Sequence, residues 1–412
     1  MKSIYSVLFM LSVLLISCTE HAESDITPNQ FKGSDTRRIQ AAVDKASLTT
    51  GKVVIPDFNS NGSGIWLLDS AILLPKNITV ILNNCTLQLS DQCRDNMFRS
   101  NNVGIGITEP VWSENICIIG IGDVYLKGAT NPRATGDGSR TLVSSPQKGR
   151  VSYGSDAGNK KVKQKGDWRN IMILMGYVNG FKLKNINIIN AHAWAVSFER
   201  TINAEISGVN IHCPKMQMID GKERFVANRD GIDLRHGCKN FHIENISGVT
   251  GDDFIALSTL GIYAKNTEGG TLNSTMVTTK RWRGKEDDTE QIFINGITCK
   301  SSTRAIAIRA NDIASINNVN INGLMSEGGY NALLIGGKGY GKNSQPGKIN
   351  NIHAMNIISR DSSSMIQIEE PISDCSFLNG IYKGIGNKLF IYNIDKSKTT
   401  NIISHNLIKV RK

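Results

Sequence analysis

Residues 294–297 read Ile-Asn-Gly-Ile, two apolar residues separated by two polar or small ones, and this four-residue pattern recurs along the chain. It starts at residues 82, 118, 183, 206, 243, 294, 321, 352 and 378. Apart from two longer intervals, the starts are 36, 23, 37, 27, 31 and 26 residues apart, a spacing typical of solenoids, propellers or arrays. Each unit holds short alternating Ile and Val runs, which indicate strands. The repeat predicts an all-β right-handed parallel β-helix, a solenoid.

Two other interpretations of the repeat compete with the solenoid. Asn-Gly pairs are typical of two-residue hairpin turns, but a hairpin needs two strands of similar length, and here only a short apolar run follows each pair. Propeller blades repeat regularly at about 40 to 50 residues, whereas these intervals vary. In a solenoid, Asn side chains at stacked turns form ladders between successive coils.

Composition and charge narrow the class of protein. The chain has 412 residues and is 40% hydrophobic, enough to bury a substantial core, which excludes a disordered chain and a disulfide-stapled miniprotein. The formal net charge of +11 favours an anionic partner. Because no nucleic-acid-binding motif is present, nucleic acid is not the expected partner.

The first residues predict secretion. Residues 4–16 are almost wholly apolar, too short for the roughly 20 residues of a membrane span but suited to a signal-peptide core. They lead into Ser17-Cys18, which looks like a bacterial lipobox, so residues 1–17 are predicted to be a lipoprotein-type signal peptide and Cys18 the acylated residue. An ordinary signal peptide cut nearby is the alternative. We expect export across the inner membrane and lipid anchoring in the bacterial cell envelope (outer membrane or periplasm), with the lipid as the only membrane contact.

After a polar tether over residues 18–28, one domain is expected from residue 29 to residue 412. Residues 34–46 combine N-cap candidates with apolar residues at helical spacing, which predicts a helix. A solenoid needs such a cap because its terminal coil would otherwise expose apolar surface and unpaired strand edges. β-Helices of this kind are usually self-sufficient, so a monomer is expected.

Two inserts and the cysteines complete the organisation. Residues 127–169 and 259–290 are long, basic excursions, expected either to shape the binding face or to be solvated loops. The seven cysteines after Cys18 show no metal or redox spacing. Buried free thiols are favoured, although a disulfide between Cys213 and Cys238 is compatible with an extracytoplasmic location.

The residues that carry chemistry lie in two short motifs. Residues 228–233 read Asn-Arg-Asp-Gly-Ile-Asp, and residues 251–257 read Gly-Asp-Asp-Phe-Ile-Ala-Leu. Each motif alone is an ordinary turn. However, Asp230 and Asp252 are 22 residues apart, about one coil, so a solenoid places them at equivalent positions on rungs roughly 4.8 Å apart. With Asp253 they are expected to form a cluster in which like charges raise the pKa of some carboxyl groups, so that one stays protonated while another is ionised. Glycoside hydrolysis needs this combination of one acid and one base.

In this order, the motifs resemble the pectin-lyase-like β-helix superfamily, and within it glycoside hydrolase family 28, the polygalacturonases and their relatives. The likeness runs over about residues 30–385 and includes the cap and the stretches 168–171 and 193–196. It implies an inverting hydrolase that needs no cofactor or metal.

The same resemblance implies a role for each acid. Asp252 is the general acid, and Asp230 with Asp253 holds and activates the water. Asn228 and Asp233, from the first motif, are expected beside the substrate. Inversion also requires the two carboxyl groups to be about 6.5 to 9.5 Å apart.

The chain departs from the family pattern around these acids. The family's Asn-Thr-Asp is Asn-Arg-Asp here, which places Arg229 beside the proposed base. Where a Gly-His-Gly motif is expected, residues 301–306 read Ser-Ser-Thr-Arg-Ala-Ile, so that histidine is absent and Arg304 lies near its place.

The family's Arg-Ile-Lys, which grips the galacturonate carboxylate, is also altered. It is matched either by residues 332–338, ending in Lys338, or by residues 307–309, ending in Arg309; the first preserves the coil count and is preferred. The retained or new cations suit a sulfate or a differently placed carboxylate, or they act as surface charges or counter-ions to the acids. His192 either lines the cleft or is a hydrogen-bonded structural histidine.

Three functions remain open at this level. The leading hypothesis is an inverting glycoside hydrolase acting on an anionic or pectin-related polysaccharide, not on unsubstituted polygalacturonate. The second is a polysaccharide lyase on the same fold, with a basic residue that abstracts a proton and Ca²⁺ held by carboxylates. The third is a carbohydrate-binding β-helix without catalysis.

Overall fold

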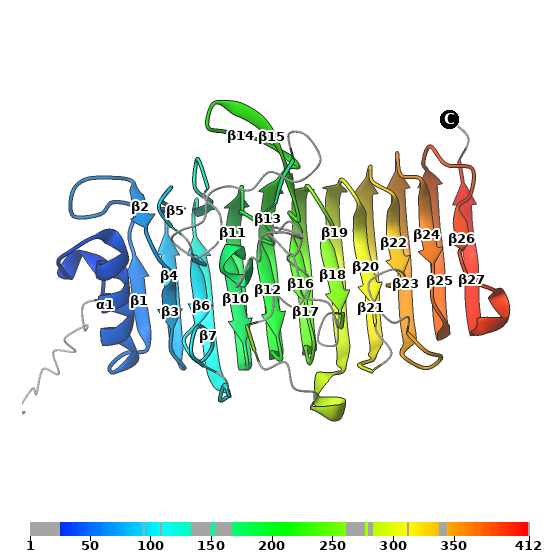
Figure 1. Ribbon diagram of the computed structural model, residues 1–412, viewed down its shortest axis with the longest axis horizontal. Coiled ribbons are helices and arrows are strands. Elements are labelled where there is room, and N and C mark those ends of the chain that lie inside the picture. The colour runs from blue at the N-terminus through cyan, green and yellow to red at the C-terminus, as the bar shows by residue number, and fades with distance from the viewer. Residues whose placement is uncertain are drawn as a thin grey trace, which may run out of the picture.

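The chain winds into a solenoid whose coils stack along the longest axis of the molecule (Figure 1). The computed structural model describes residues 25–93, 95–107, 109–132, 150–152, 167–260, 277–278, 283–310, 313–337 and 344–410. Within them, two parallel sheets run the length of the solenoid and enclose one apolar core. The predicted β-helix with one N-terminal helix is therefore confirmed.

The longer sheet has fourteen strands. Its main path is β1 (Lys52–Ile55), β4 (Ile78–Asn83), β7 (Ser113–Ile121), β11 (Val178–Ile189), β13 (Ile202–Cys213), β17 (Lys239–Thr250), β19 (Thr289–Ser301), β21 (Ile316–Glu327), β23 (Ile349–Arg360), β25 (Ile372–Lys383) and β27 (Thr399–Lys409). Three short strands branch from it, β2 (Ile65–Leu68), β5 (Thr86–Leu89) and β8 (Tyr125–Lys127).

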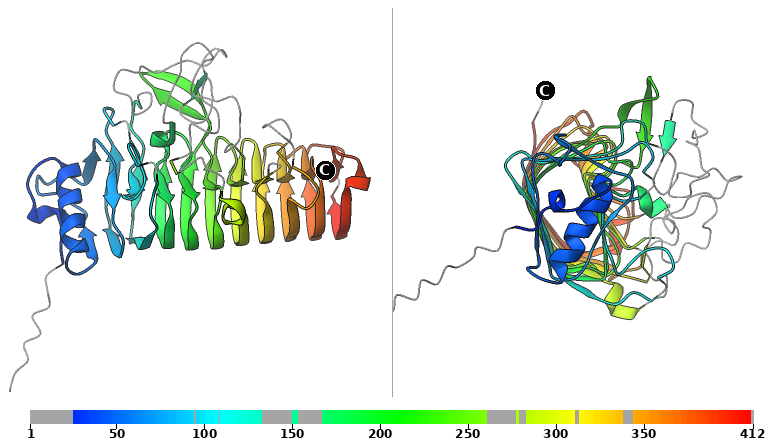
Figure 2. Two further views of the ribbon diagram at one scale, coloured as in Figure 1. Left: turned by 60° about the horizontal axis from the view of Figure 1, so that its bottom comes forward. Right: turned by 90° about the vertical axis from the view of Figure 1, so that its left-hand side faces the viewer.

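The second sheet has ten strands and carries the acidic motifs. It consists of β3 (Ile72–Leu74), β6 (Phe98–Ser100), β10 (Ile173–Gly176), β12 (Val196–Glu199), β16 (Ile232–Leu234), β18 (Ile255–Ser258), β20 (Arg304–Arg309), β22 (Asn331–Ile335), β24 (Ser364–Ile368) and β26 (Phe390–Tyr392). A small third sheet, made of β9 (Arg150–Ser152), β14 (Met216–Ile219) and β15 (Lys222–Ala227), projects above the coils (Figure 2).

Asparagine stabilises the coils in two ways. Among the described residues it supplies 15 of the 21 non-glycine residues with positive φ, because its short polar side chain tolerates the left-handed conformation. Its amides also form ladders between coils: Asn240 donates to Asn203, and Asn203 donates to Asn179, each at 2.7 Å.

The four-residue repeat needs a correction at both ends. At the N-terminal end Leu82 pairs with Gly120 and not with Ile118. Ile294 pairs with Ile321, as the repeat predicts, but Ile321 pairs with Ala354 and not with Ile352. Leu378 pairs with Met355, so the last unit also begins one residue from its predicted place. Loops of different length join the coils, and the strand register, not the spacing in sequence, determines which residues are equivalent.

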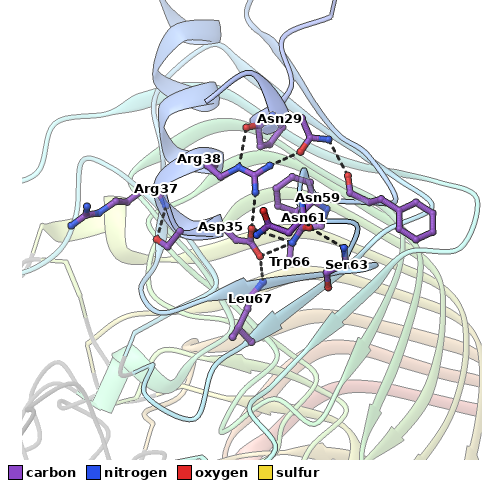
Figure 3. A network of polar contacts seen from close by, with 12 residues as sticks. Asn29, Asp35, Arg37, Arg38, Asn59, Asn61, Ser63, Trp66 and Leu67 are labelled. Atoms are coloured by element: carbon purple, nitrogen blue, oxygen red, sulfur yellow. Dashed lines mark hydrogen bonds and ion pairs between the residues drawn. The ribbon is translucent and has the colours of Figure 1, made fainter. Parts of the chain in front are cut away.

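The helix α1 (Asp35–Ser47) closes the N-terminal end of the solenoid (Figure 2). Its apolar face enters the common core, and Ser34 caps its first turn by accepting a hydrogen bond from the Arg37 N–H. A buried polar network ties it to the first coil (Figure 3). Arg38 donates to Asp35 at 3.2 Å, and Asp35 accepts from the Leu67 N–H at 2.9 Å.

Short 3-10 helices, η1 (Pro28–Gln30), η2 (Asp167–Asn170), η4 (Gly284–Asp287) and η5 (Lys396–Lys398), lie outside the strands. Cys213 and Cys238 are buried free thiols, so the disulfide considered between them is not formed. Within the described residues, no helix is long and apolar enough to cross a membrane.

The second insert, residues 259–290, is fixed to the coil of β12 by buried contacts. The Glu199 carboxylate accepts bonds from the Thr278 N–H at 2.9 Å and the Thr278 hydroxyl at 2.7 Å. Arg200 pairs with Asp287 at 2.7 Å, and both side chains are fully buried. Residues 261–276 and 279–282 of this insert, and most of residues 127–169, lie outside the described residues.

Candidate active site

Four carboxylates gather on the outer face of the second sheet. Asp230 immediately precedes β16 and Asp233 lies within it, while Asp252 and Asp253 precede β18. The two strands pair in parallel, with Asp233 opposite Ala256. One oxygen from each of Asp230, Asp252 and Asp253 lies within 4.8 Å of the other two.

The register differs by one residue from the sequence prediction. Ile232 pairs with Ile255, an offset of 23 residues rather than 22. Consistent with that offset, the Gly231 N–H donates to the Asp253 carbonyl at 2.9 Å, and the Asp252 N–H donates to the Arg229 carbonyl at 3.0 Å. Asp230 is therefore equivalent to Asp253, and Asp252 lies one residue before the aligned pair.

A local break in strand alternation turns the acids outward. Side chains in a regular strand alternate between faces. Here Phe254 and Ile255 are consecutive and both lie in the core, as Ala305 and Ile306 do on the next coil. As a result Asp253 and Ala256, three residues apart, line the same cavity.

Asp253 is the fixed anion of the cluster. Its carboxylate pairs with Arg309 at 2.5 Å and with Arg304 at 3.4 Å, and it contacts the Thr303 hydroxyl at 2.7 Å. Burial alone raises the pKa of Asp253, but the two guanidinium groups and the hydroxyl outweigh burial and hold the pKa below its ordinary value. Asp253 is therefore ionised near neutral pH.

The pKa values of the other three acids are shifted upward, in the opposite direction to that of Asp253. Burial, followed by the charge of Asp253, raises the pKa of Asp252 to about 6. Burial and the neighbouring carboxylates raise the pKa of Asp230 well above its ordinary value, and burial does the same for Asp233. Neighbouring carboxyl groups with opposed shifts are the arrangement that acid-base catalysis uses.

The acids enclose a cavity of about 50 Å³, enough for a water molecule. It is lined by Trp194, Asn228, Asp230, Asp233, Asp252, Asp253, Ala256, Ser258, Leu260, Arg304 and Arg309. Oδ1 of Asp230 and Oδ2 of Asp233 are buried and accept no hydrogen bond from any described residue. Two larger hollows, of about 540 and 430 Å³, lie elsewhere on the solenoid, and none of the four acids lines either.

The predicted cations have different positions. Arg309 is buried against Asp253, so it serves as a counter-ion, whereas the Arg304 side chain is 22% exposed and lies 5.7 Å from the centre of the Tyr330 ring. Lys338, in the preferred register for the substrate cation, lies outside the described residues, as Cys18 does. No cation lies within β22, the strand that follows Arg309 in the sheet.

Two predicted substrate contacts do not line the cavity. Arg229 is buried, and its guanidinium donates to the Pro214 carbonyl at 2.8 Å and to the Gln217 side chain. Nε2 of His192 accepts a hydrogen bond from the Ala129 N–H at 2.9 Å, and burial lowers the pKa of His192 to about 3. Both side chains connect their coil to neighbouring segments of the chain, away from the acids.

Sequence reasoning missed Thr303, and it singled out Trp194 only within the family-like stretch 193–196. Thr303 contacts both Asp252 and Asp253, although nothing in the sequence distinguished it from its two serine neighbours. Trp194 lines the cavity, and the Arg235 guanidinium lies over its ring at 5.0 Å. The coil register was the available signal, since it makes Thr303 equivalent to Asp252 and Trp194 equivalent to Asp230.

The three clustered acids are close enough to hold a hard cation such as Ca²⁺. A cation there would compete with Arg309, which already occupies one oxygen of Asp253. The arrangement therefore serves proton transfer more directly than metal binding.

The family model described as glycosyl hydrolases family 28 matches residues 133–376, more than half of the chain. No curated protein sequence matches the chain.

Solved structures match almost the whole chain at low identity. The polygalacturonase of Erwinia carotovora ssp. carotovora is 16% identical, with 94% of this chain and 97% of that one covered and a TM-score of 0.56. The endo-xylogalacturonan hydrolase of Aspergillus tubingensis is 14% identical, with 91% and 93% covered and a TM-score of 0.51. PfbA, a surface adhesin of Streptococcus pneumoniae, is 10% identical, with 94% and 93% covered and a TM-score of 0.51. These likenesses show the fold.

The buried ion pair between Arg309 and Asp253 predicts a pH-dependent loss of stability. Arg309→Met leaves Asp253 buried without its main counter-ion, and we expect the free energy of unfolding at pH 7 to fall by about 3–5 kcal/mol. Burial then raises the pKa of Asp253, so the loss grows as pH rises from 4 to 7 and the carboxyl is forced to ionise. Urea unfolding at both pH values measures it.

Arg304→Met is the matched control. The guanidinium of Arg304 is farther from Asp253 than that of Arg309 and is partly exposed. The expected loss in the free energy of unfolding is therefore below about 1 kcal/mol. Equal losses for the two variants, or a loss in Arg309→Met that does not change with pH, would show that Arg309 does not compensate Asp253.

Proposed function

The chain belongs to the glycosyl hydrolases family 28, and from that premise we propose that it cleaves a pectin-related, anionic polysaccharide by single displacement with inversion. It is a glycoside hydrolase. In the proposed reaction Asp252 protonates the leaving oxygen. Asp230 and Asp253 hold the water that attacks the sugar, and Asp253 receives its proton.

The observation that carries this proposal is the opposed displacement of adjacent carboxyl groups. Asp252, with a pKa of about 6, keeps a proton in mildly acidic solution, while Arg309 and Arg304 keep Asp253 ionised. A hydrolase of this class needs one carboxyl group in each state. The buried, unpartnered Oδ1 of Asp230 supplies an acceptor for the water in the cavity.

The substrate class follows from how the cations are used. Arg309 is committed to Asp253, and β22 carries no Lys or Arg, so the described residues do not reproduce a paired grip on a galacturonate carboxylate. Arg304 is the partly exposed cation at the cavity, with a planar guanidinium suited to a carboxylate or sulfate. Two similar structures are named a polygalacturonase and an endo-xylogalacturonan hydrolase, which supports a pectic polysaccharide. The use of the cations is what favours a substrate other than unsubstituted polygalacturonate.

Stereochemistry provides a separate test. The acid oxygens lie within 4.8 Å, closer than the about 6.5–9.5 Å usual for inverting enzymes and nearer the about 5–5.5 Å of retaining ones. We favour inversion because the ionised carboxylate is held by Arg309, while an unpartnered oxygen of Asp230 is available to water. Proton NMR of the first product should show the anomer opposite to the substrate linkage. Retention would instead assign a nucleophilic carboxylate.

A product screen tests the reaction itself. The purified chain from residue 19 onward is incubated with pectic, sulfated and neutral glycans, and reducing ends and ultraviolet-absorbing unsaturated ends are measured in parallel. We expect reducing ends without unsaturation, and at least about a hundredfold loss of rate in Asp252→Asn, which cannot donate the proton. Asp123→Asn, at an exposed acid outside the cavity, is the matched control.

The same screen separates the alternatives. Unsaturated ends lost on adding a chelator would identify a lyase. Glycan binding that survives Asp252→Asn, with no turnover of any glycan, would identify a binding module.

We also propose that Cys18 is acylated and anchors the protein in the cell envelope. The apolar run at residues 4–16 followed by Ser17-Cys18 supports this. Full-length protein expressed in a bacterium should partition into detergent and incorporate labelled palmitate, whereas Cys18→Ser should do neither. A wild-type protein that remains in the aqueous phase without label would exclude the anchor.

A further inference from the structure

The hydroxyl group of Thr303 lies between the proposed acid and the ionised carboxylate. Its Oγ1 is 2.8 Å from Oδ1 of Asp252 and 2.7 Å from Oδ1 of Asp253, both ordinary lengths for O–H···O hydrogen bonds. The local backbone is fixed: the Thr303 N–H donates to the Ser301 hydroxyl at 3.0 Å, and that hydroxyl donates to the Asp252 carbonyl at 2.8 Å.

Two such bonds require a proton on one of the carboxyl groups. A hydroxyl group has a single hydrogen, so Thr303 can donate to only one carboxylate. For the second contact to be a hydrogen bond, the other carboxyl group must donate to the Thr303 oxygen. If both Asp252 and Asp253 were ionised, one of the two contacts would place a hydroxyl lone pair against a carboxylate.

The surrounding charges determine which carboxyl group holds that proton. Arg309 and Arg304 both contact Asp253, which favours its ionised form. Asp252 is partly buried and has the negative charge of Asp253 beside it, and both favour its protonated form. Asp252 therefore donates to Thr303, and Thr303 donates to Asp253.

We propose that Thr303 is a positioning residue that links the acid to the base and returns the proton between them after each turnover. The proposal rests on the function assigned to Asp252 and Asp253 above. In that reaction Asp252 gives its proton to the leaving oxygen, and Asp253 takes one from the attacking water. The products leave behind an ionised Asp252 and a protonated Asp253, the reverse of the starting state.

The Thr303 hydroxyl can restore the starting state without bulk solvent. Asp253 gives its proton to the Thr303 oxygen while Thr303 gives its own hydrogen to Asp252, so the hydroxyl is unchanged and one proton has moved. The transfer runs from the group with the lowered pKa to the group with a pKa of about 6, which is downhill. Among the described residues that line the cavity there is no histidine to provide another route.

The test compares Thr303→Val, which removes the hydroxyl but keeps the shape, with Thr303→Ser, which keeps the hydroxyl. On the substrate found in the product screen, we expect Thr303→Val to lower kcat about tenfold or more with KM unchanged. Thr303→Ser should retain most of the wild-type kcat. Because the variant must reset through solvent, its kcat should rise with the concentration of a small buffer acid. The wild-type rate should not.

A second measurement needs no substrate. Infrared difference spectra at pH 5, wild type minus Asp252→Asn, should isolate the protonated-carboxyl component of Asp252 from those of Asp230 and Asp233. That component should change frequency in Thr303→Val and return in Thr303→Ser. Thermal unfolding checks that the variants are folded, and Thr303→Ala replaces the valine variant if that one is not.

Several results would overturn the link. They are an unchanged kcat in Thr303→Val, equal losses in the valine and serine variants without any buffer dependence, or a band indifferent to Thr303. Full activity in Asp252→Asn would instead refute the assigned function, independently of Thr303.

Discussion

The parallel hydrogen bonding between successive coils is the constraint on which the site depends. Rungs of a parallel sheet lie about 4.8 Å apart, so any side chains at equivalent outward positions must be close neighbours. The 23-residue offset from β16 to β18 places Asp230 beside Asp253, and the next coil adds Thr303 and Arg304. Residues from three successive coils thus form one cluster.

Four acids in a partly dry cavity cannot readily ionise, and the arginines make ionisation of one of them favourable. Burial and mutual repulsion favour protonated carboxyls, so an ionised one requires adjacent cations. Arg309, whose guanidinium lies 2.5 Å from the Asp253 carboxylate, supplies the main positive charge that compensates Asp253. A cation used in this way is no longer available to substrate. The departure from the family's substrate-binding pattern and the stability of the catalytic charge are therefore two consequences of the same contact.

Much of the architecture could be predicted from sequence because its signals are periodic. The apolar repeat predicts the coils, and residues 34–46 predict the cap, since both depend on local pattern. Side-chain direction at the site was harder to predict. Two consecutive inward residues, Phe254 and Ile255, break the two-residue alternation, and no sequence signal marks such a break. Arg229, adjacent to Asp230 in sequence, turns toward Pro214 instead of the acids.

Where the family resemblance leads one to expect a histidine, the chain has Thr303 and Arg304, which changes what can titrate in the site. A histidine has an unperturbed pKa of about 6.5 and would change its charge in the range where Asp252 does, so the two groups would titrate together. A threonine hydroxyl does not titrate in this range, and an arginine remains charged. Any change in the charge of the described cavity near neutral pH therefore comes from its carboxyl groups alone. The fixed anion Asp253, partial burial and a bridging hydroxyl then determine the state of Asp252, so the chain keeps an acid in its protonated form without the family's imidazole.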